Sequence, residues 1–176
     1  MASIVLLHSA VGLRPAVLAD AERLRSAGHT VVTPDMYEGA TFRTVEEGVA
    51  HRDVVGEDVL AVRAAAATEG LPPGQVWAGY SLGGWFALEA LQRHGGAGAL
   101  FVGFDGAPSN GVPCQVHVAD GDPWVEQDAL TALAARGVEV HRYAGGHLFC
   151  DPDLPDSDAA STALLWERAL EFLARL

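Results

Sequence analysis

Residues 79–83 read Gly-Tyr-Ser-Leu-Gly, the clearest chemical pattern in the chain. This G-x-S-x-G form belongs to a sharp strand-to-helix turn that presents a serine nucleophile. Small residues on both sides allow the turn, which lifts Ser81 Oγ above the sheet edge. The turn also leaves the N–H of Leu82 free at the start of a helix, where it can stabilise an oxyanion. The pattern predicts Ser81 as a nucleophile and Leu82 as an oxyanion donor, against the alternative of a chance glycine-rich turn.

A serine hydroxyl needs a base to become a good nucleophile, and in folds that carry this serine turn the base is a histidine that comes last in the chain. Four histidines follow Ser81. His94 ends a helical pattern, and His117 and His141 fall inside strand patterns. His147 instead follows a strand pattern through a short glycine-rich loop. We therefore expect His147 to be the base.

The third partner should be a carboxylate that orients the histidine and stabilises its imidazolium. Asp120 and Asp122 both follow the predicted strand 114–119. Asp105, after the preceding strand, is a weaker third option. Spacing does not choose between Asp120 and Asp122, and either could cap the helix that follows.

A second oxyanion donor is expected in the loop after the first strand, residues 8–13. The N–H of Ala10 is the first choice and that of Ser9 the alternative. His8 raises the question of a metal site with His147 and Asp122, but no two histidines have the close helical spacing of a metalloprotease. We expect neither a metal nor a cofactor.

The elements that must position these residues alternate regularly along the chain. Strands are predicted at 3–7, 30–33, 75–78, 99–103, 114–119 and 138–143. Helices are predicted at 14–27, 57–69, 82–93, 126–136 and 157–176, with a loop and a short helix in 35–52. This alternation predicts one α/β domain over 1–176, a doubly wound, mostly parallel six-stranded sheet with helices on both faces. Ligands bind such sheets beyond the carboxyl ends of the strands, where the reactive residues fall.

Composition narrows the function classes. The net charge of −12 argues against nucleic acid and disfavours anionic membranes. No apolar run approaches the roughly 20 residues that span a bilayer, and no signal peptide is evident. The two cysteines fit no zinc motif. We expect a cytoplasmic protein, a monomer or homodimer, whose partner is a small molecule.

Several segments, in this order and spacing, resemble the dienelactone hydrolase family over nearly the whole chain. They are Leu-His-Ser-Ala-Val-Gly-Leu at 7–13, Val-Val-Thr-Pro-Asp-Met-Tyr at 31–37, the Ser81 turn, Asp-Pro-Trp-Val at 122–125 and Tyr-Ala-Gly-Gly-His-Leu-Phe at 143–149. The resemblance implies a minimal α/β-hydrolase without a cap domain. It favours Asp122 over Asp120, and it implies Leu82 and Ala10 as the oxyanion donors.

The chain departs from the family pattern at three places. Ser81 replaces the cysteine of founding members, and Ser9 replaces the glutamate that interacts with that cysteine. Cys150 and Asp151 occupy the stretch where dienelactone-specific members carry an arginine, and an aspartate there would repel a substrate carboxylate. Arg43 or Arg52 could still supply a cation. These departures argue against dienelactone itself as the substrate.

We therefore expect a serine hydrolase that cleaves a small ester or lactone through Ser81, His147 and Asp122 by way of an acyl-enzyme. The alternatives are a non-catalytic small-molecule-binding protein on the same fold, or an acyltransferase or perhydrolase with the same residues. The residues expected around the substrate are Ser9, Tyr80, Trp124 and Phe42, with Trp85 as a further wall.

Overall fold

The six strands of the computed structural model, which describes residues 1–176, form one entirely parallel sheet. The spatial order is β2-β1-β3-β4-β5-β6. The strands are β1 (Ser3–Leu7), β2 (Thr30–Val32), β3 (Val76–Tyr80), β4 (Gly98–Val102), β5 (Cys114–Ala119) and β6 (Glu139–Tyr143). The order reverses direction at β1, so the chain winds outward on both sides, as the alternating pattern predicts.

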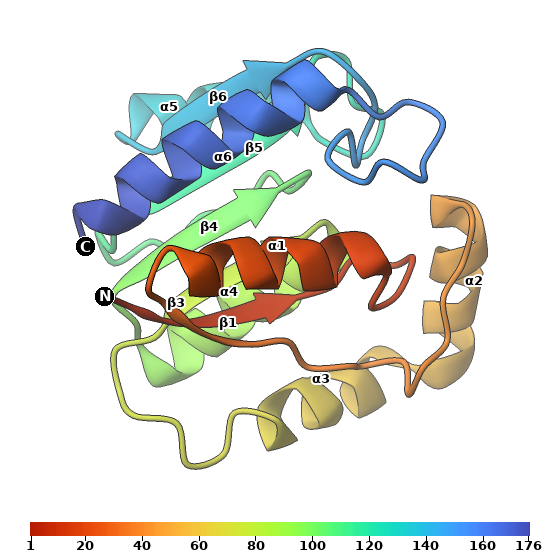
Figure 1. Cartoon of the computed structure of the whole chain (residues 1–176), viewed down its shortest axis with the longest axis horizontal. Coiled ribbons are helices and arrows are strands. Elements are labelled where there is room, and N and C mark those ends of the chain that lie inside the picture. The colour runs from red at the N-terminus through yellow and green to blue at the C-terminus, as the bar shows by residue number, and fades with distance from the viewer.

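Six helices surround the sheet: α1 (Pro15–Ser26), α2 (Val45–Val55), α3 (Glu57–Ala66), α4 (Leu82–His94), α5 (Gln127–Ala135) and α6 (Ala159–Ala174). α1 and α6 cover one face, whereas α3, α4 and α5 cover the other (Figure 1). α2 stands apart, beyond the arrowheads of the strands (Figure 1). No helix is both long and apolar enough to cross a membrane.

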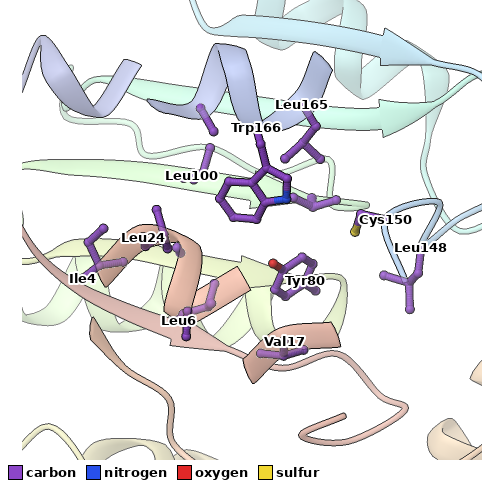
Figure 2. Packing of buried hydrophobic residues seen from close by; sticks show 14 of the residues in the cluster. Ile4, Leu6, Val17, Leu24, Tyr80, Leu100, Leu148, Cys150, Leu165 and Trp166 are labelled. Carbon is purple, nitrogen blue, oxygen red and sulfur yellow. The ribbon is translucent and has the colours of Figure 1, made fainter. Parts of the chain in front are cut away.

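Two apolar clusters hold the layers together, one on each face of the sheet. The first joins β1, β3 and β4 to α1 and α6. Figure 2 shows Trp166 of α6 extending toward Tyr80 and α1 within this cluster. The second packs Leu60, Phe86 and Leu130 of α3, α4 and α5 against the other face. Helices on both faces leave the edge formed by the carboxyl ends of the strands for the functional loops.

The predicted elements agree with the structure to within two residues at each end, except at α2 and at α3, which ends at Ala66 and not at the expected residue 69. β3 extends through Gly79 and Tyr80 to the residue before Ser81, so the strand runs directly into the turn. α2 is a full helix of 11 residues where a loop with a short helix was expected. Thr44 and Glu47 begin it with a reciprocal capping box, a signal that was present in the sequence.

Candidate active site

Ser81 lies in a strained turn between β3 and α4. Its backbone has φ 49° and ψ −112°, a conformation that residues with side chains rarely adopt. The N–H of Ser81 donates to the carbonyl of Val102 on β4 at 2.8 Å, which fixes the turn to the sheet. A Cβ on Gly79 would overlap the carbonyl group of Gly83. The glycines on either side of Ser81 are therefore a steric requirement of the turn.

His147 connects Ser81 to Asp122. Its Nδ1 lies 2.7 Å from Asp122 Oδ2, and its Nε2 lies 2.7 Å from Ser81 Oγ. A carboxylate can only accept, so Nδ1–H donates to Asp122 and Nε2 is left to accept from the serine hydroxyl. Three loops that follow different strands thus meet at the carboxyl edge of the sheet, in the arrangement that activates a serine.

Asp122, not Asp120, is the carboxylate in contact with His147. The Asp122 side chain is fully buried, and its second oxygen accepts the N–H of Trp124 at 2.9 Å. The Asp120 side chain is 71% exposed and lies 3.9 Å from Arg142. Asp105 is also occupied elsewhere, because its Oδ2 accepts the N–H of Glu126.

Gly103 makes room for the histidine and was not identified from the sequence. It follows β4 with a positive φ of 64°. A Cβ at this position would lie 2.9 Å from the carbonyl oxygen of His147 and 3.1 Å from its ring. A glycine directly after a strand next to the nucleophile strand was the available signal.

The two expected oxyanion donors share a cavity with Ser81. Ala10 and Leu82 both line the cavity into which Ser81 opens. No hydrogen bond within the chain uses the backbone N–H of either residue. Two free amides beside a serine hydroxyl are the groups that can hold an oxyanion.

His8 holds the loop that carries Ala10. Its Nδ1 lies 2.7 Å from the carbonyl oxygen of Ser9, and its Nε2 accepts the N–H of Met36 at 3.0 Å. Complete burial lowers the pKa of His8 and keeps the ring neutral. Both ring nitrogens are therefore occupied by backbone groups.

Asp151 is not the repulsive group that the sequence suggested. It is buried and accepts from Arg14 Nε at 2.6 Å, and a second guanidinium nitrogen lies at 3.4 Å. Arg14 also donates to the carbonyl of Phe42 at 2.8 Å. We expected Asp151 to repel a substrate carboxylate. That expectation was wrong, because Arg14 pairs with Asp151 and neutralises its charge. The ion pair instead ties the loop after His147 to the loop after β1.

The residues expected around the substrate divide into two groups. Trp124 lines the Ser81 cavity, which has a volume of about 300 Å³. Ser9, Tyr80 and Phe42 do not line it. Tyr80 lies in a strand, where successive side chains alternate between faces, and its hydroxyl donates to Asp20 at 2.7 Å in the core.

Ser9 and Phe42 are likewise used for packing and loop structure. Ser9 is buried, and its hydroxyl accepts the N–H of Val11. The Phe42 ring packs 6.0 Å from Tyr37 and 4.9 Å from His51. Trp85, the further wall, does line the cavity, as does Arg52, whose guanidinium is held by Asp53 at 2.7 Å.

The two cysteines do not form a disulfide. Cys114 and Cys150 are both buried free thiols. Burial raises the pKa of Cys114 to about 12 and raises that of Cys150 still further from its usual range. Neither thiol is therefore an activated nucleophile.

Comparison with known proteins identifies the family. The model of the dienelactone hydrolase family matches residues 1–176. This chain belongs to the dienelactone hydrolase family. The resemblance inferred from the sequence motifs is thereby confirmed, and the family consists of hydrolases with the α/β-hydrolase fold.

Solved structures share this fold at low sequence identity. A dienelactone hydrolase-like promiscuous phosphotriesterase from metagenomic libraries is 20% identical with a TM-score of 0.76, over 100% of this chain and 87% of that one. A cold-adapted esterase from an Arctic intertidal metagenomic library is 19% identical with a TM-score of 0.63, over 99% and 82%. Alpha/beta hydrolase domain-containing protein 10 from mouse is 14% identical with a TM-score of 0.68, over 98% and 90%. No curated protein matches the sequence.

Proposed function

We propose that this member of the dienelactone hydrolase family is a serine hydrolase that cleaves small carboxylic esters or lactones through an acyl-enzyme. The observation that carries the proposal is the pair of 2.7 Å contacts that join Asp122 to His147 and His147 to Ser81, whose backbone is strained. The two free amides of Ala10 and Leu82 beside Ser81 support it further.

In the first half of the reaction, Ser81 Oγ attacks the carbonyl carbon and its proton passes to His147 Nε2. The carbonyl oxygen becomes an oxyanion that accepts from the N–H groups of Ala10 and Leu82. Asp122 stabilises the imidazolium and keeps its orientation. The bond to the alcohol oxygen then breaks as that oxygen takes the proton from Nε2, which leaves an acyl ester on Ser81.

In the second half, water attacks the acyl carbon and gives a proton to His147 Nε2. The bond to Ser81 Oγ breaks as the serine takes that proton back, and the carboxylic acid leaves. The same histidine is base and acid in turn, and the protein returns to its starting state. Water, the serine and the histidine supply every proton and electron pair in this sequence.

A panel of short-chain esters and lactones, measured with wild type and Ser81→Ala together, tests the proposal. We expect wild type to cleave members of the panel and Ser81→Ala to lose roughly 10⁶-fold in kcat while keeping its circular dichroism spectrum. Hydrolysis that survives unchanged in Ser81→Ala would contradict the proposed nucleophile. Binding of the panel without turnover in wild type would favour the non-catalytic alternative.

A further inference from the structure

Two separate cavities open beside Ser81 and His147. One is lined by Ser81 and the other by His147, and each has a volume of about 300 Å³. They share only two lining residues, Val45 and Trp124. These two side chains therefore lie between the cavities and divide the space around the reacting groups.

We call Val45 and Trp124 the divide, and the backbone of each is fixed by contacts within the protein. The backbone N–H of Trp124 donates to Asp122 Oδ1 at 2.9 Å, and its ring centroid lies 5.9 Å from that of His147. Val45 is the first residue of α2, directly after Thr44, whose side chain begins the helix with a capping box. The backbones of both residues are thus held in place, close to the histidine on one side and on a capped helix on the other, while the Trp124 side chain is 45% exposed.

The linings of the two cavities differ. The Ser81 cavity contains Leu82 and Ala10, whose amides are free, and apolar walls from Trp85 and Phe104. The cavity beside His147, which we call the His147 cavity, is lined by Leu148, Leu154 and Pro155 together with the charged residues Arg43, Glu46 and Asp156.

The chemistry of acyl transfer assigns a role to each cavity. The carbonyl carbon must bond to Ser81 while its oxygen lies at the Ala10 and Leu82 amides, so the acyl group extends into the Ser81 cavity. The alcohol oxygen must come within hydrogen-bond reach of His147 Nε2 to take its proton. His147 lines the His147 cavity and not the Ser81 cavity, so the alcohol part extends toward the His147 cavity.

We propose that the site selects open-chain esters over small-ring lactones, with the acyl part in the Ser81 cavity and the alcohol part in the His147 cavity. This inference rests on the proposed serine hydrolase function. In an open-chain ester the two parts diverge from the ester bond and pass on opposite sides of Trp124 and Val45. In a small lactone a covalent tether joins them, and the tether must occupy the space that these two side chains fill.

A matched pair of substrates isolates this difference. Phenyl propanoate and 3,4-dihydrocoumarin are both esters of a phenol, and they differ by the single carbon–carbon bond that closes the lactone ring. Each kcat/KM is divided by the rate constant for hydroxide hydrolysis of the same compound, which removes the intrinsic reactivity of the lactone. Misplacement of a substrate by about 1 Å costs on the order of 100-fold, so we expect wild type to favour phenyl propanoate by at least about tenfold.

Substitutions at Trp124 and Val45 should change the ratio of ester to lactone hydrolysis, whereas substitution of Trp85, the matched control, should not. Trp124→Ala removes the ring but keeps the N–H that donates to Asp122, and we expect it to reduce the preference several-fold. Trp85→Ala removes the same side chain from a wall that belongs to the Ser81 cavity alone. It should change acyl-size preference and leave the ester-to-lactone ratio within about twofold of wild type. Val45→Leu adds volume to the divide and should widen the preference, which provides a second test should Trp124→Ala fail to fold.

The outcomes separate the two levels of the argument. If wild type cleaves phenyl propanoate through Ser81 but processes dihydrocoumarin equally well or better after normalisation, the divided site is overturned and the serine hydrolase stands. If Trp85→Ala and Trp124→Ala change the ratio equally, the assignment of the divide is overturned. If Ser81→Ala keeps the phenyl propanoate activity, the proposed function fails and the inference with it.

Discussion

His147 and His117 offer a comparison within one molecule, because each is a buried histidine with a partner within 2.8 Å of both ring nitrogens. His147 lies between Ser81 and Asp122 in the loop that follows β6. His117 lies inside β5, where its Nδ1 is 2.7 Å from the Tyr143 hydroxyl and its Nε2 is 2.8 Å from Gln115 Oε1. The rings are alike, so the partners and the position in the sheet make the difference.

The partners decide whether a proton can be accepted. Asp122 can stabilise an imidazolium at His147, whereas a phenol and an amide offer His117 no negative charge. Burial, with smaller contributions from His141 and Arg168, lowers the pKa of His117 to about 3. The sheet interior thus keeps one histidine neutral, while the strand end gives the other a carboxylate and an opening to a cavity.

The largest effect should come from His147→Ala. Removal of the base should lower kcat for ester hydrolysis roughly 10⁶-fold, because Ser81 then has no group to take its proton. His117→Gln, the matched change in the sheet, should keep kcat within about tenfold of wild type, since the His117 ring contacts Tyr143 and Gln115 and makes no hydrogen bond to Ser81, Asp122 or His147. Steady-state kinetics on one ester measure both, and equal losses would remove the distinction between the two histidines.

Asp122→Asn should have the next largest effect. An amide in this position can donate to Nδ1 and so favour the wrong tautomer of His147, with an expected loss of about 10⁴-fold in kcat. Asp120→Asn is the control, because its exposed side chain contacts Arg142 and not the histidine. A loss at Asp120 that matches the loss at Asp122 would contradict the geometry.

The Arg14–Asp151 pair tests how firmly the loop after His147 is held. Arg14→Met leaves a buried carboxylate unpaired and should lower the free energy of unfolding by about 3 kcal/mol. Arg14→Met with Asp151→Leu removes both charges and should recover part of that loss. Denaturant titration measures both variants, and an unchanged stability in Arg14→Met would show that the pair does not hold the loop.

The pH dependence of stability gives the smallest predicted effect and reports on His117. Its pKa is lower in the folded protein than in the unfolded chain, so the unfolded chain binds the extra proton first. Stability is therefore complete above the unfolded pKa and falls as the pH decreases. We expect the loss of stability between pH 7 and pH 5 to be about 2 kcal/mol larger in wild type than in His117→Gln, because His8, whose pKa is also lowered by burial, contributes equally in both proteins. Unfolding titrations of both proteins at the two pH values measure the difference, and identical slopes would contradict the neutral buried ring.

Most of the fold could be predicted from the sequence because its strands are short apolar runs separated by periodic helices with clear stop signals. Ser81 and His147 were identifiable because a G-x-S-x-G turn and a histidine in a glycine-rich loop both follow strands. The choice of Asp122 needed the family resemblance, since Asp120 has the same local setting.

The pocket was harder to predict because side-chain direction depends on the alternation within β3 and on contacts across loops. Tyr80 is adjacent to Ser81 in sequence, yet its side chain enters the core and donates to Asp20. The neutralisation of Asp151 depends on Arg14, which is 137 residues away in the chain. Pairings of this kind are fixed by the tertiary structure, and local sequence patterns do not contain them.

The most direct test of the central claim is the labelling of Ser81 by a fluorophosphonate, with the modified residue located by peptide mass spectrometry. We expect wild type and His117→Gln to be labelled at Ser81 at comparable rates, and His147→Ala to be labelled far more slowly. Labelling at another residue, or equal labelling of Ser81 with and without His147, would contradict the account.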